Sequence, residues 1–135
     1  MRRFTLSLVG IGLLVAGCSA EAPATTPEPV TGPSEASLEA AATELNTAMA
    51  ARDAEAAWTT YSQRCKDIFG SPEVFEMMLE ANYQDRNPDI REVTVKVNGS
   101  SGQVVTVDED PAATADSMKP RTWTFIDGAW QYDSC

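Results

Sequence analysis

The chain has no histidine. The side chains that could take part in acid–base or nucleophilic chemistry are therefore its three cysteines and its carboxylates and phenols. Cys18 has the most distinctive surroundings, since it follows two small residues, Ala16 and Gly17, at the end of an apolar run. Small residues fit a narrow peptidase pocket, and the Cys18 thiol is the one group nearby that can be alkylated. The spacing therefore predicts processing and modification at this cysteine.

The stretch Leu14–Cys18 resembles the lipobox of bacterial lipoproteins. It follows a basic start at Arg2-Arg3 and an apolar segment, which is the order of parts in an export signal. The apolar segment, residues 4–16, is shorter than the roughly 20 residues that a transmembrane helix needs. The resemblance implies that residues 1–17 are a cleaved signal peptide and that Cys18 carries a diacylglycerol and palmitate. It places the protein on the extracytoplasmic face of the cell membrane, anchored by lipid.

The segment after Cys18 is rich in proline and contains almost nothing that could enter a core. We expect residues 18–33 to be the lipidated cysteine and a disordered tether, and residues 34–135 to form one domain. Without residues 1–17 the chain has 8 basic and 20 acidic side chains, a net charge of −12. Such acidity argues against nucleic acid as a partner and against attraction to anionic headgroups.

Spacing of apolar residues predicts three helices in the first half of the domain. The first begins near Ser34 or Ser37 and ends near residues 51–52, and the second begins after Asp53 and continues to Cys65. The third follows Ser71-Pro72, where serine is a good N-cap and proline a good first residue. Pro88 ends the helical half.

Apolar residues alternate after Pro88, which predicts strands at about residues 90–98, 104–107, 121–126 and 129–132. Asp127-Gly128 is a dipeptide favoured in type I′ hairpin turns. A two-residue turn there places Phe125 opposite Trp130 and Trp123 opposite Tyr132, with both pairs on one face of the sheet.

The resulting α+β domain resembles secreted actinobacterial members of the NTF2-like superfamily. The residues that carry the resemblance are Ser62–Cys65, the helix from Phe75 onward, and the ending Asp127–Cys135. The resemblance implies an NTF2-like (SnoaL-like) cone, with three helices packed on a curved antiparallel sheet of about four strands around a pocket. Sheets of this superfamily often dimerise, so a homodimer is one expectation.

Cys65 and Cys135 are the cysteines that remain once Cys18 is lipidated, and export would place them where disulfides persist. We therefore predict a Cys65–Cys135 disulfide. Strict alternation from Trp130 and Tyr132 would put Cys135 on the face opposite these aromatics. Either the last strand bulges near Asp133-Ser134, or Cys135 lies beyond the end of the strand.

The pocket implied by the resemblance contains no Asp/His acid–base pair, because the chain has no histidine. Polar groups on the predicted helices could serve as acid or base if they were buried, but they are also explained as core phenols and solvated carboxylates. They are Tyr61, Asp67, Glu76, Tyr83 and Asp85. Aromatic residues outnumber them and are the predicted pocket lining, namely Trp58, Tyr61, Trp123, Phe125, Trp130 and Tyr132.

These observations favour a non-enzymatic accessory domain of the cell envelope that binds a small apolar or sugar-like ligand or an envelope protein. We predict no catalytic residues, no cofactor and no metal. Two alternatives stay open. One is a small-molecule enzyme of the cyclase, dehydratase or isomerase kind, and the other is a surface-interaction domain whose cone is filled by side chains.

Overall fold

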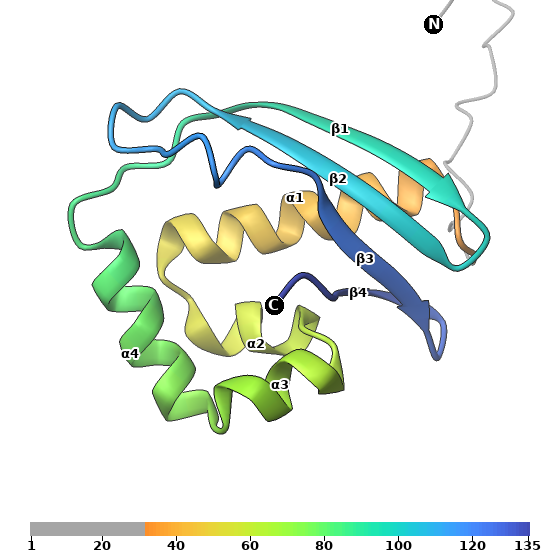
Figure 1. The fold of residues 1–135 in the computed structure, drawn as a ribbon, viewed down its shortest axis with the longest axis horizontal. Helices are drawn as coiled ribbons and strands as arrows, with labels where there is room; N and C mark the ends of the chain where they lie inside the picture. Colours follow the sequence, from red (N-terminus) through yellow and green to blue (C-terminus); the bar gives the residue numbers. More distant parts are fainter. Residues whose placement is uncertain (1–31) are drawn as a thin grey trace, which may run out of the picture.

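The computed structural model describes residues 32–135, which form an α+β domain of four helices followed by a four-stranded antiparallel sheet (Figure 1). The predicted signal peptide, Cys18 and nearly all of the predicted tether lie outside the described residues. Within residues 32–135, no helix is long and apolar enough to cross a membrane. The elements are α1 Glu35–Ala51, α2 Ala54–Thr60, α3 Gln63–Phe69, α4 Pro72–Tyr83, β1 Ile90–Asn98, β2 Ser101–Asp108, β3 Arg121–Ile126 and β4 Ala129–Tyr132.

The first helix begins at Glu35, as the serine signals predict. Ser34 is its N-cap and accepts a hydrogen bond from the backbone N–H of Ser37, whose hydroxyl in turn accepts one from the N–H of Ser34. The helix ends at Ala51, and the residue after it, the C-cap Arg52, adopts the left-handed conformation with a φ of 56°. Its buried stripe packs against the sheet, and Figure 1 shows α1 lying along one face of β1 and β2.

The predicted second helix is wrong in one respect, because it is broken into α2 and α3 at Tyr61-Ser62. Tyr61 is extended, and Ser62 caps the new helix by accepting a hydrogen bond from the N–H of Cys65. The break is made by β4: the N–H of Ser62 donates to the carbonyl of Tyr132 over 2.9 Å. This contact between distant parts of the chain outweighs the local helical pattern, so the domain has four helices rather than three.

The sheet has the order β1-β2-β3-β4, with each strand antiparallel to its neighbour. Asp127 and Gly128 both have positive φ, as a type I′ turn requires. Trp123 pairs with Tyr132 and Phe125 pairs with Trp130, which confirms the predicted register of the last hairpin.

One close approach between α1 and the sheet depends on Gly102 in β2. A Cβ atom at this position would lie 2.5 Å from Leu38 Cδ2, so any side chain here would require the buried Leu38 side chain to shift. The ring of Trp130 lies beside the same glycine, and its indole N–H donates to Ser37 Oγ over 2.9 Å. The start of α1 is thereby held on β2 and β4.

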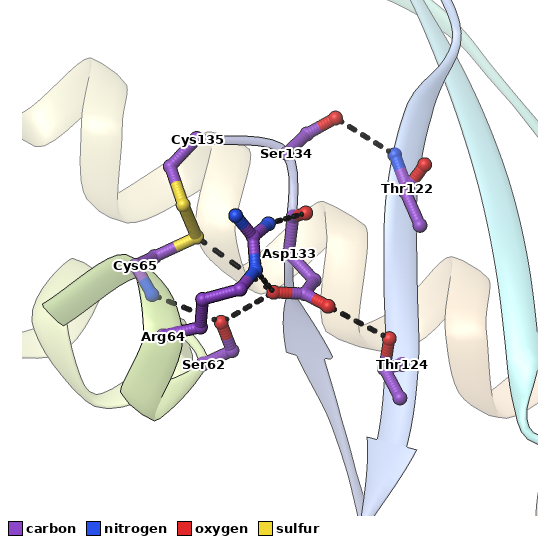
Figure 2. Close-up of a disulfide and its surroundings, with 8 residues drawn as sticks. All are labelled: Ser62, Arg64, Cys65, Thr122, Thr124, Asp133, Ser134 and Cys135. Atoms are coloured by element: carbon purple, nitrogen blue, oxygen red, sulfur yellow. Dashed lines mark hydrogen bonds and ion pairs between the residues drawn. A yellow bond between two sulfur atoms is a disulfide. The ribbon is translucent and has the colours of Figure 1, made fainter. Parts of the chain in front are cut away.

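Cys65 and Cys135 are joined by a disulfide, with an S–S distance of 2.08 Å (Figure 2). The strand β4 ends at Tyr132, so Cys135 lies beyond the ladder, which is the second of the two geometries left open by the sequence. Asp133 fixes this ending by accepting hydrogen bonds from Ser62 Oγ at 2.6 Å and Arg64 Nε at 3.0 Å. Burial alone would raise the pKa of Asp133, but these hydrogen bonds outweigh it and lower the pKa below its ordinary value.

Candidate functional site

A cavity of about 180 Å³ lies between α1 and the helix-facing side of the sheet. Its walls come from α1, from the α2–α3 junction, from the end of α4 and from all four strands, so it is assembled by the whole domain. The apolar part of its lining is Ala42, Leu45, Met49, Ile90, Val104 and Trp123. The polar part is Asn46, Tyr61, Tyr83, Arg86, Thr106, Asp108, Ser117, Arg121 and Tyr132.

All three tyrosines of the chain line this cavity. Tyr61 and Tyr132 lie with their ring centroids 4.9 Å apart, and Tyr83 approaches them from the end of α4. No side chain or backbone group in residues 32–135 hydrogen-bonds to any of their hydroxyls. Burial raises the pKa of Tyr61 far above its ordinary 10.0, and burial also raises the pKa of Tyr83 and Tyr132. At neutral pH the three phenols are therefore protonated and able to donate.

Arg121, at the start of β3, brings a positive charge to the same wall. Its Nη2 donates to the carbonyl of Asp116 at 2.7 Å and to Asp116 Oδ2 at 3.2 Å. Asp116 is largely exposed, with 65% of its side chain accessible. The other guanidinium nitrogens of Arg121 make no hydrogen bond within residues 32–135. This arginine is thus a charged donor with spare capacity at the cavity.

Arg86 is held very differently. Its guanidinium contacts Asp108 and Asp110, whose side chains are 7% and 5% exposed. Asp108 Oδ1 also accepts the backbone N–H groups of Asp89 at 2.8 Å and Asp110 at 3.0 Å. A hydrogen bond from the N–H of Ala112 is the main reason why the pKa of Asp110 lies below its ordinary value, with further help from Asn87 and Arg86. This cluster of Arg86, Asp108 and Asp110 ties the chain after α4 to the end of β2, and it contributes Arg86 and Asp108 to the cavity lining.

The structure brings together three of the six aromatic residues predicted to line a pocket: Tyr61, Trp123 and Tyr132. The other three pack elsewhere in the domain. Trp58 packs on Phe75, with 5.5 Å between ring centroids, and Phe125 packs on Trp130, with 5.3 Å between them.

The candidate acids and bases divide in the same way. Tyr83 lines the cavity beside Tyr61, whereas Asp67, Glu76 and Asp85 are exposed and do not line it. Asp67 instead accepts a hydrogen bond from Gln63 Nε2 over 2.7 Å. Of the candidate acids and bases, only the phenols of Tyr61 and Tyr83 therefore line the cavity, and the three carboxylates are exposed to solvent.

No protein-family model, curated protein or solved structure matches this chain. Among the described residues, no group of three or more histidine, cysteine, aspartate or glutamate side chains could hold a metal ion.

Sequence reasoning missed Arg86, Asp108 and Arg121. The Asp108-Glu109-Asp110-Pro111 run stops β2 and gives no local sign that two of its carboxylates turn inward. One signal is present in the sequence: Arg121 opens a strand whose alternate residues, Trp123 and Phe125, are predicted to share one face and to line the pocket. Alternation would have placed the arginine on that face as well.

Proposed function

We propose that this protein is a membrane-tethered extracytoplasmic lipoprotein whose domain binds a small apolar or sugar-like molecule and is not an enzyme. We also propose that the domain is an NTF2-like cone, because its helices cover one face of a four-stranded antiparallel sheet and a cavity lies between them. The observation that carries the binding proposal is the cavity itself, which combines an apolar wall with three phenol hydroxyls that no described residue uses.

The size of the cavity limits the ligand. At about 180 Å³ it lies below the roughly 300–1,000 Å³ of drug-sized ligand pockets. An apolar cavity of about 150 Å³ accommodates benzene, so this one suits a molecule only slightly larger than a single ring. A ligand of that size would contact Trp123 and the tyrosine rings over most of its surface.

Binding is favoured over catalysis by the protonation states of the lining groups. The phenols have raised pKa values, so they are poor bases at neutral pH. The carboxylate in the lining, Asp108, is engaged by Arg86 and by two backbone N–H groups. What remains free to meet a ligand is a set of hydrogen-bond donors and apolar surface, which can hold a molecule without moving its protons.

We predict that the full chain, purified in detergent, binds benzene and benzyl alcohol in this cavity. Ala42 is buried in the cavity wall, so Ala42→Leu should occupy part of the space and abolish binding measured by titration calorimetry. Ala50→Leu places the same side chain on the exposed side of α1 and should leave binding unchanged. If neither probe binds, or if Ala42→Leu binds as well as Ala50→Leu, the cone is functionally filled and the surface-interaction alternative replaces this proposal.

A second prediction concerns the lipid anchor. Cys18 is the residue that the lipobox resemblance assigns to the acyl chains, so Cys18→Ser should abolish palmitate labelling and leave the protein either unprocessed or released from the membrane fraction. Metabolic labelling with palmitate, followed by fractionation, measures both effects. Cys135→Ser is the matched control, because it removes a cysteine outside the lipobox and should keep the label. Undiminished labelling of Cys18→Ser would contradict the lipoprotein assignment.

A further inference from the structure

The strongest hydrogen-bond acceptor of the cavity has partners within the domain, whereas several of the cavity's donors have unused bonding capacity within residues 32–135, and this difference indicates what kind of ligand would fit. Asp108 is the carboxylate in the lining, and its oxygens already accept from Arg86, Asp89 and Asp110. The hydroxyl of Ser117 donates to the carbonyl of Thr114 over 2.6 Å. The strongest acceptor at the cavity is therefore satisfied within the domain.

Several hydrogen-bond donors of the cavity, in contrast, have unused bonding capacity. The hydroxyls of Tyr61, Tyr83 and Tyr132 make no hydrogen bond to the described part of the chain. Arg121 uses only Nη2, and its partner Asp116 is exposed. The positive charge of Arg121 acts on both Tyr61 and Tyr132. Four donor groups thus meet at one cavity, and one of them is charged.

From this juxtaposition we infer that the ligand of the cavity is a small monocarboxylate of about one ring in size, with its carboxylate held by Arg121 and the tyrosine hydroxyls. This inference rests on the proposed binding function and names the chemical class of ligand. Hydrogen bonds in which one partner is ionised are about twice as strong as neutral ones, so an anionic acceptor gains most from these donors. The contact between Asp116 and Arg121 shows that a carboxylate fits this guanidinium.

Two features restrict the ligand to a single negative charge. The Arg86 guanidinium is already shared by two buried carboxylates, so Arg121 is the cation in the lining with nitrogens to spare. The chain is also acidic overall, with a net charge of −10, which disfavours polyanions. The apolar wall of Leu45, Met49 and Trp123 then receives the hydrocarbon part.

The test titrates the full chain in detergent with sodium benzoate and with benzyl alcohol, a neutral molecule of the same size. We expect benzoate to bind at least about tenfold more tightly, since a hydrogen bond to a charged group contributes more than a neutral one. Arg121→Gln should remove this preference by lowering the affinity for benzoate to about that for benzyl alcohol. Tyr61→Phe removes one hydroxyl and keeps the ring, so it should weaken benzoate binding by about tenfold.

Arg91→Gln is the matched control, because Arg91 also pairs with carboxylates, Asp89 and Glu109, but does not line this cavity. It should bind both probes as the wild type does. Equal affinity for the two probes, or tighter binding of benzyl alcohol, overturns the carboxylate inference and leaves the binding function standing. A preference for benzoate that survives in both Arg121→Gln and Tyr61→Phe also overturns it. Failure of both probes to bind the wild type overturns the binding function as well.

Discussion

Cys135→Ser should destabilise the domain by about 4 kcal/mol, the value that the chain-entropy model gives for a crosslink spanning 70 residues. For a domain of about 100 residues this corresponds to a melting temperature lower by about 15 °C or more. Cys65 is completely buried, so replacing its partner Cys135 leaves the free thiol of Cys65 inside the core. Thermal and urea unfolding of the oxidised protein and the variant measure the difference.

Reduction of the wild type provides the internal control. If the disulfide acts by restricting the unfolded chain, wild type treated with a reductant should unfold like Cys135→Ser, and the variant itself should not respond to the reductant. The hydrogen bonds of Asp133 to Ser62 and Arg64 are present in both proteins, so they cancel in the comparison. Identical urea midpoints for oxidised and reduced wild type would show that these polar contacts hold the C-terminus without the disulfide.

Arg86→Met should cost about 3–5 kcal/mol of unfolding free energy, because it leaves two buried carboxylates without their countercharge. Asp108 and Asp110 keep their backbone N–H donors, but these donors carry no net charge. Arg91→Met is a matched comparison, since Arg91 also pairs with two carboxylates and is 58% exposed. Exposed ion pairs contribute at most about 1 kcal/mol, so the Arg91 variant should unfold nearly as the wild type does.

The same argument predicts a rescue. Adding Asp108→Asn and Asp110→Asn to Arg86→Met removes the two orphaned charges, and the triple variant should regain much of the lost stability. Urea unfolding of the four proteins completes the comparison. If the Arg86 and Arg91 variants lose equally little, or if the asparagine substitutions deepen the loss, the buried charges are not what makes Arg86 important.

Where local chemistry decides an element, the sequence predicted it. Ser34 and Ser71-Pro72 mark the starts of α1 and α4, and Asp127-Gly128 marks the last hairpin. The two-residue turn then sets the cross-strand pairing of Trp123 with Tyr132, because register follows from loop length. Capping, turn formation and alternation depend on residues within a few positions of one another, so a single sequence contains all that they require.

Contacts between distant segments decided the rest. The break between α2 and α3 depends on a hydrogen bond from Ser62 to Tyr132, 70 positions later, which no helical pattern can reveal. Which polar side chains meet at the cavity was likewise settled by packing: Arg121 comes to Tyr61 and Tyr83 only when the sheet covers α1. Burial then gives these groups their chemistry, since a phenol in water and a phenol removed from it differ in pKa. The sequence gives the identity of each side chain, whereas only the tertiary structure determines which side chains are buried.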